Sequence, residues 1–196
     1  MDRKFREERN NALEEIQKAL TEKMREKALW SQEFVKGKES PMSLPDYMQL
    51  QETFRAPAFA IYAVTDLKDD KSLKEVFSRV SGRYQAKDPR QVLGVASDLV
   101  RSPEAKTDGR LSAFEDVLKV LEVAERDFDA TYKPLTRESL DYWRKKHPID
   151  DQNLEIAYRE NQRHFMTESL KEIRQLVLDL RDAKPSPGAA PKTPRP

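Results

Sequence analysis

The sequence predicts an all-α protein: a helical bundle of about six to seven helices, with long amphipathic helices at both ends and a disordered, proline-rich C-terminal tail. Three observations support this fold class. Apolar residues recur at steps of three and four, which places them on one face of a helix. Charged residues make up 36% of the chain and hydrophobic residues 37%, as is typical of helices with broad polar faces. Prolines and glycines separate the periodic stretches.

The first helix is expected from about Asp2 to Lys36, and Gly37 ends it. Its far end carries Trp30 and Phe34 beside another large apolar residue. Because this group is wider than a narrow apolar face, it either meets the hydrophobic middle of the chain or forms a patch that binds a partner. The rest of the apolar face consists of Phe5, Leu13, Ile16, Leu20 and Met24.

The second helix is expected to begin at Ser43, which can cap it, with Pro45 in the first turn and Asp46 at the acidic position of a capping box. Residues 56–64 are the ambiguous part of the chain. Their β-branched and aromatic content suits a buried strand, whereas their alanines suit a buried helix. Because no second strand-like run is present, the segment is predicted to be a helix that is kinked or restarted at Pro57.

The middle of the chain predicts four shorter helices, each delimited by a capping residue, a proline or a glycine. Asp70 or Ser72 opens the first of them. The polar segment 102–109 is expected to be a loop. The four helices are expected from Asp70 or Ser72 to about Gly82, and from about Asp88 to Val100, Leu111 to Tyr132 and Thr136 to Lys146.

The last helix is expected to run from Ile149 to Lys184 without a proline. Its first half mixes apolar residues with Asn161 and His164, so two environments are expected along its length and an interface near its middle. Asn161 either fixes the register between helices or marks where the helix leaves the core. The second half keeps a regular seam that is either core or partner interface. This seam consists of Met166, Leu170, Ile173, Val177 and Leu180.

Residues 1–183 are predicted to form a single α-helical domain, and residues 184–196 a tail that is disordered or in polyproline II. The tail contains five prolines and one glycine. Its segment Pro191–Arg195 is a PxxP pattern beside a basic residue, of the kind that SH3-type domains bind. A plain solubilising tail is the expected alternative.

The charge balance and the lack of targeting features limit which classes of protein this chain can belong to. The 36 lysines and arginines nearly balance the 35 aspartates and glutamates, so the overall positive field of a dedicated nucleic-acid binder is missing. The chain has no cysteine, its N-terminus has no apolar core of a signal peptide, and its longest apolar run is about half a membrane span. These features predict a cytoplasmic protein without a membrane span, although they do not address secretion without a signal.

Few residues suggest chemistry. His164 has Glu160 and Glu168 four residues away on either side, which suits a divalent metal, but a solvated charged strip is the expected interpretation. No glycine-rich phosphate loop and no nucleophile elbow is present. The chain is therefore predicted not to be an enzyme and to hold no metal or cofactor.

The segment Tyr142-Trp143-Arg144-Lys145-Lys146 is the sharpest local cluster. Aromatic residues beside cations can stack on bases and neutralise phosphates. The same residues also describe a short helix whose Trp143 packs inward while its basic end meets the negative end of the helix dipole. Packing is the expected interpretation, and nucleic-acid binding is the alternative.

Residues 100–104 with 109–111 are loosely similar to the helical delivery domains of bacterial type IV secretion substrates, but the match is too short to assign a family or any residue's role. The predicted function is a non-enzymatic protein–protein interaction module, such as a scaffold, adaptor, chaperone or effector-like protein. Its apolar helix faces would bind another protein or a second copy, in a coiled-coil manner. An accessory nucleic-acid-binding protein is the alternative.

Overall fold

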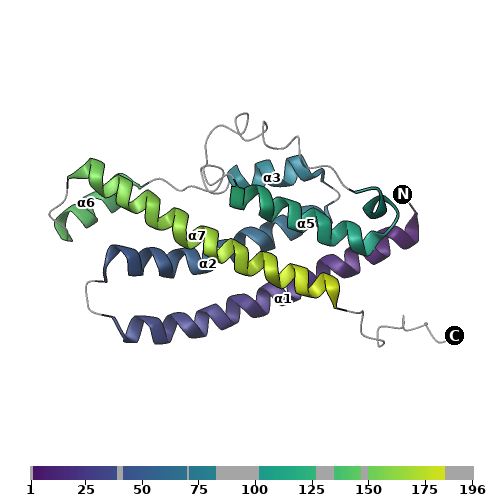
Figure 1. Cartoon of the computed structure of the whole chain (residues 1–196), viewed down its shortest axis with the longest axis horizontal. Coiled ribbons are helices and arrows are strands. Elements are labelled where there is room, and N and C mark those ends of the chain that lie inside the picture. Colours follow the sequence, from purple (N-terminus) through teal and green to yellow (C-terminus); the bar gives the residue numbers. More distant parts are fainter. Residues whose placement is uncertain are drawn as a thin grey trace.

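The computed structural model describes residues 2–38, 42–69, 71–82, 102–126, 135–146 and 150–183. All secondary structure in these ranges is helical, which confirms the predicted all-α class (Figure 1). The predicted helix 88–100 and the tail 184–196 lie outside the described residues. The elements are α1 (Arg3–Lys36), α2 (Leu44–Lys68), α3 (Leu73–Gly82), the short 3-10 helix η2 (Glu104–Lys106), α5 (Gly109–Arg126), α6 (Arg137–Lys146) and α7 (Asp151–Asp182).

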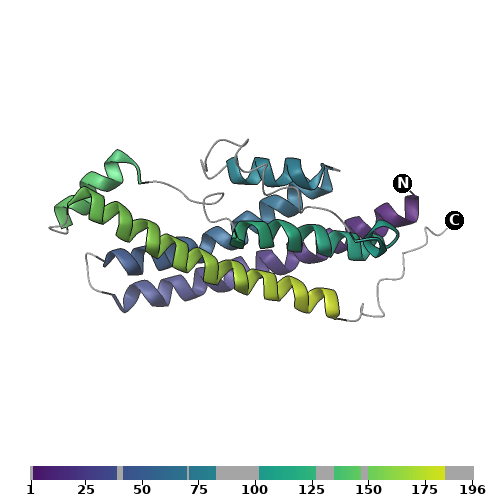
Figure 2. The same cartoon turned by 45° about the horizontal axis from the view of Figure 1, so that its top comes forward.

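The long helices pack in a simple arrangement. α1 and α2 form an antiparallel hairpin, α7 lies mainly along α2, and α5 packs against α1 and α7 (Figures 1 and 2). α3 packs on α2 and α5, and α6 packs against α7. α1 and α7 also contact each other directly, but much less extensively than each of them contacts α2.

Capping side chains begin several of these helices where the sequence predicts. The backbone N–H of Asp46 donates to the Ser43 hydroxyl at 3.3 Å, and Ser43 is the N-cap of α2. For α3, the backbone N–H of Glu75 donates to the Ser72 hydroxyl at 3.3 Å, which selects Ser72 over Asp70 as the capping residue. Local side-chain chemistry therefore determines where these helices start.

Residues 56–64 are helical, as predicted, but α2 continues through Pro57 without a restart. Proline has no N–H to donate to the carbonyl of Thr53, and a proline inside a helix costs about 3 kcal/mol. Phe59 and Val64 are both fully buried, and each contributes about 2 kcal/mol or more. Burial of this segment therefore outweighs the cost of the proline.

The main core is formed by α1, α2, α3, α5 and α7. It includes the first part of the α1 face and the apolar face of α5. The seam of α7 is covered, which answers the question that its spacing leaves open: these residues are core. Met166, Leu170, Ile173 and Val177 are buried, and Leu180 is partly buried against the same cluster.

A second, smaller apolar cluster joins the start of α2, α6 and the first half of α7. α7 therefore has two environments along its length, as predicted. Asn161 donates to the carbonyl of Ala157 in its own helix at 2.7 Å, so it does not set the register between helices through this bond. The buried members of the cluster are Leu44, Met48, Trp143, Leu154 and Tyr158.

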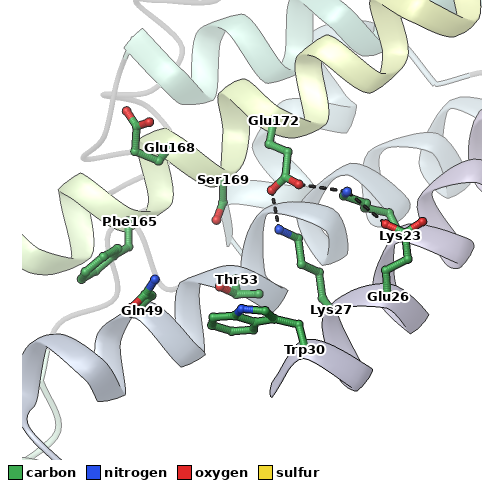
Figure 3. A pocket seen from close by; sticks show the side chains of 10 residues that line it. All are labelled: Lys23, Glu26, Lys27, Trp30, Gln49, Thr53, Phe165, Glu168, Ser169 and Glu172. Carbon is green, nitrogen blue, oxygen red and sulfur yellow. Dashed lines mark hydrogen bonds and ion pairs between the residues drawn. The ribbon is translucent and has the colours of Figure 1, made fainter. Parts of the chain in front are cut away.

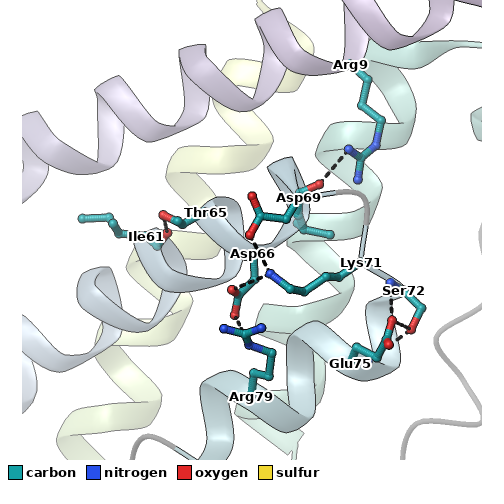
Figure 4. A network of polar contacts seen from close by, with 10 residues as sticks. Arg9, Ile61, Thr65, Asp66, Asp69, Lys71, Ser72, Glu75 and Arg79 are labelled. Carbon is teal, nitrogen blue, oxygen red and sulfur yellow. Dashed lines mark hydrogen bonds and ion pairs between the residues drawn. The ribbon is translucent and has the colours of Figure 1, made fainter.

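A buried ionic contact ties α1 to α5 and α2. The Arg9 guanidinium lies 3.1 Å from the Asp116 carboxylate and donates to the carbonyl of Leu67 at 2.9 Å. Nearby, the buried Asp66 carboxylate contacts Lys71 at 3.3 Å and Arg79 at 3.5 Å (Figure 4). These contacts fix the turn after α2 against the rest of the bundle.

Candidate protein-interaction groove

The apolar face of α1 extends beyond the core. It is buried up to Leu20, and none of the residues 21–36, here called the α1 arm, is buried. Yet the same helical spacing continues through Met24, Lys27, Trp30 and Phe34, all partly buried. The α1 arm thus presents a face built for packing that the described residues cover only in part.

Beside the arm lies a groove of about 500 Å³, here called the α1–α7 groove (Figure 3). The arm forms one wall, the middle of α7 forms the other, and α2 contributes residues between them. The groove lies beside the middle of α7, which is where the sequence predicts an interface. The lining residues are Lys23, Glu26, Lys27, Trp30, Gln49, Thr53, Phe165, Glu168, Ser169 and Glu172.

Aromatic rings give the groove its apolar character. Trp30 stacks on Phe34 with ring centroids 4.5 Å apart, and neither residue belongs to either core cluster. The Lys38 ammonium lies 4.6 Å from the centre of the Phe34 ring. Phe165 faces the groove from α7 (Figure 3). Of the predicted interface residues, Trp30 lines this groove and Phe34 stacks on Trp30. The five seam residues of α7 pack in the core instead.

Four polar side chains of the groove have unused hydrogen-bonding capacity. The Trp30 indole N–H, the Gln49 amide and the hydroxyls of Thr53 and Ser169 make no hydrogen bond to another described residue. They come from all three helices that line the groove (Figure 3). A bound polypeptide could therefore exchange hydrogen bonds with the groove from several directions.

A charged clasp closes one end of the groove. The Glu172 carboxylate of α7 accepts from Lys23 at 2.9 Å and from Lys27 at 2.5 Å, both on the arm (Figure 3). Partial burial raises the pKa of Glu172, but the hydrogen bonds from Lys27 and Lys23 outweigh burial and leave the pKa below its ordinary value. The clasp therefore requires the ionised form of Glu172 and joins the arm to α7.

Replacing Glu172 with glutamine is expected to lower the free energy of unfolding at pH 7 by less than about 1 kcal/mol, because the pair is partly exposed. Since the folded pKa is lowered, this stabilisation is complete above the ordinary glutamate pKa of about 4.3 and is lost as the pH falls through the lower folded value. Urea unfolding at pH 7 and pH 2.5 measures the difference. A matched control is Glu33→Gln, whose carboxylate pairs with Lys36 on its own helix at 74% and 70% exposure, and which is expected to change the free energy of unfolding by less than about 0.5 kcal/mol at either pH. An equal Glu172→Gln effect at both pH values would contradict the clasp.

The aromatic and basic segment of α6 lies away from the groove. Trp143 is buried and packs edge-on against Tyr47 at 5.3 Å, as the packing interpretation expects. Tyr142 is exposed, and Arg144 lies 3.4 Å from Asp141. Lys145 and Lys146 are exposed. Because Trp143 is in the second cluster, this helix presents only one exposed aromatic ring beside its cations.

His164 is exposed and contacts Phe165 edge-on, with ring centroids 5.0 Å apart. Glu168 pairs with Lys171 at 3.0 Å, and this hydrogen bond is the main reason that the pKa of Glu168 is lowered. Within the residues that the structure describes, no group of three or more histidine or acidic side chains is placed to hold a metal ion.

The sequence predicted only part of this groove. Gln49, Thr53 and Ser169 are polar and carry no periodic signal, so their position at a groove follows only from the packing of three helices. Phe165, Ser169 and Glu172 do recur at steps of four and three, on a face of α7 next to the seam. That spacing places the three residues on one helix face, but the face is not recognisable as a unit from the sequence because it mixes aromatic, polar and acidic residues.

None of the helices in the described ranges combines the length and the apolar composition that a membrane crossing needs. Comparison of the chain with protein-family models, with curated proteins and with solved structures finds no match.

Proposed function

We propose that the chain is a non-enzymatic protein–protein interaction module that binds a segment of a partner protein in the α1–α7 groove and along the α1 arm. One observation carries the proposal: the packing face of α1 continues for several turns beyond Leu20 without being buried. Apolar faces that the surrounding chain covers only in part can serve as interaction surfaces, and tryptophan is enriched among the residues that dominate binding energy.

The area of the partly buried rings also allows an estimate of the free energy of binding. A partner would bury on the order of 50 Å² more of Trp30 and of Phe34, which is about 1 kcal/mol for each ring. Association costs at least about 4 kcal/mol, so the rings alone do not hold a partner. The partner must also fill the groove and use its free hydrogen-bonding groups. Such a balance favours transient binding, as suits a scaffold, adaptor or chaperone.

The proposal predicts site-specific capture of a partner at the groove. A photo-crosslinking residue at Glu26, whose side chain lines the groove and is 66% exposed, is expected to give a discrete adduct of higher mass in cells. The matched control is Glu7 in the same helix, 60% exposed and outside the groove, where no such adduct is expected. The captured protein, identified by mass spectrometry and purified, should bind the wild-type chain.

A second variant distinguishes specific binding in the groove from crosslinking to a protein that is only nearby. Trp30→Ala is expected to weaken the purified interaction at least about tenfold, because it removes the largest ring of the groove. Circular dichroism verifies that this variant still folds. Equal capture at positions 26 and 7, or unchanged affinity of a folded Trp30→Ala variant, would refute the proposal.

A further inference from the structure

The chain itself contains a segment whose chemistry fits the α1–α7 groove. Residues 184–196 lie outside the described residues, and their sequence KPSPGAAPKTPRP contains five prolines, three cations and no acidic side chain. Proline fixes φ near the polyproline II value, so such a segment loses little conformational entropy when it binds in that form. Polyproline II ligands are bound by grooves lined with aromatic rings.

The groove offers what a polyproline II ligand requires. The flat rings of Trp30 and Phe165 can pack against proline rings, which are apolar and rigid. The backbone carbonyls of a polyproline II segment have no partner within the segment. The indole N–H of Trp30, the amide of Gln49 and the Ser169 hydroxyl are donors without an acceptor among the described residues. Apolar and polar parts of the ligand therefore both find a counterpart.

The dimensions of groove and segment agree. From Phe165 to Glu172 the axis of α7 rises about 10 Å. In polyproline II, Pro191 and Pro194 are separated by about 9 Å. One PxxP unit therefore spans the α7 wall of the groove from end to end.

The length of chain between α7 and this unit is sufficient. Glu172, at the near end of the groove, lies about 16 Å along the helix axis from Ala183, which follows the last residue of α7. The seven residues 184–190 span about 22 Å in polyproline II. Docking requires the chain to reverse its direction after α7, and the connecting segment contains Gly188, which accepts backbone conformations closed to other residues.

Charge favours the same pairing. Among the described residues, the carboxylates of Glu26 and Glu168 on the groove rim pair only with lysines of their own helices, at 3.0 Å each, and the two glutamate side chains are 66% and 57% exposed. Exposed pairs of this kind contribute well under about 1 kcal/mol, so these carboxylates can pair with other cations instead. Lys192, which lies between the two prolines, and Arg195, which directly follows the second, supply those cations.

We infer that the proline-rich tail of this chain, centred on Pro191 and Pro194, docks into its own α1–α7 groove and competes with the partner for it. The inference rests on the groove of the proposed function and adds its regulation. The tail occupies Trp30, Gln49 and Ser169, and a partner must displace it. Removing the two prolines therefore frees the groove.

The test uses the full chain labelled with ¹⁵N at its two tryptophans, with the Trp30 indole resonance assigned by its loss in Trp30→Phe. The double variant Pro191→Ala/Pro194→Ala is expected to shift the Trp30 resonance and leave that of Trp143 unchanged. A synthetic peptide of residues 184–196, added to this variant, is expected to return the Trp30 resonance toward its wild-type position. The same peptide with both prolines replaced by alanine is the control and is expected to have no effect.

An unchanged Trp30 resonance in the double variant, with no response to millimolar peptide, would overturn the inference. A wild-type Trp30 shift that varies with protein concentration would overturn docking within one chain, because it would assign the occupant to a second copy. The two proposals fail separately. If the Trp30 resonance does not respond to the tail but position 26 captures a partner, only the tail docking is refuted. If the Trp30 resonance responds to the tail but position 26 captures no partner, only the partner binding is refuted.

Discussion

Replacing Asp116 with alanine is expected to lower the free energy of unfolding by about 3–5 kcal/mol. Asp116 is fully buried and lies 3.1 Å from the Arg9 guanidinium, whose side chain is only 3% exposed. The variant would leave a buried cation that donates to the Leu67 carbonyl at 2.9 Å but no longer faces a carboxylate at Asp116. An uncompensated buried charge is among the most destabilising single changes known in proteins.

Urea unfolding followed by circular dichroism measures the effect. The matched control is Arg3→Ala, which breaks an ion pair with Glu7 on the same helix at 91% and 60% exposure and is expected to change the unfolding free energy by less than about 0.5 kcal/mol. The double variant Arg9→Met/Asp116→Leu removes both charges and should recover part of the loss, since apolar replacements of buried pairs are often neutral, although the Leu67 carbonyl then loses its donor. Equal losses for Asp116→Ala and Arg3→Ala would contradict the ionic contact.

Such a contact could not be predicted from the sequence. Arg9 and Asp116 are 107 residues apart, and Arg9 stands in a run of charged residues that suggests a solvated face. Helical periodicity identifies which apolar residues share a face, but it does not reveal which charge on that helix a neighbouring helix will cover. The pairing depends on how closely α5 approaches α1, which is a property of tertiary packing.

The same limit explains what the sequence predicted of the groove. Trp30 and Phe34 were identified because large aromatic residues at the end of an amphipathic helix exceed what a narrow face needs. The seam of α7 was equally visible, but periodicity does not distinguish a face packed within the chain from one that binds a partner. Only the positions of α2 and α5 show that the seam is core and that the open face belongs to α1.

The change of character along α7 was the more informative signal. The regular seam begins at Met166, and the groove lies on the helix face next to it, starting at Phe165. Where an apolar pattern loses its regularity, a helix passes from one packing partner to another, and a gap between the two clusters is the physical result. The predicted two environments and the position of the groove therefore have one cause.

The close approach of α5 to α1 leads to the second large expected effect, that of Gly109→Ala. A Cβ atom at Gly109 would lie 2.1 Å from the carbonyl oxygen of Phe5 and 3.0 Å from the backbone nitrogen of Arg9. Both are backbone atoms of α1, so no side chain can move aside, and the helices must separate. The expected cost is about 3 kcal/mol or more, which exceeds the gain of about 1 kcal/mol that alanine brings to a helix.

Gly37→Ala is the matched control, because its nearest contact would be the Phe34 carbonyl at 3.9 Å and its φ of −86° is open to any residue. This change is expected to be neutral or to stabilise by up to about 1 kcal/mol. A stabilising Gly109→Ala would show that α5 does not approach α1 so closely.

Because the separation of α5 from α1 also weakens the Arg9–Asp116 contact, Gly109→Ala and Asp116→Ala are expected to cost less together than the sum of their separate effects, by about 1 kcal/mol or more. Full additivity would mean that the glycine and the ionic contact stabilise separate parts of the bundle.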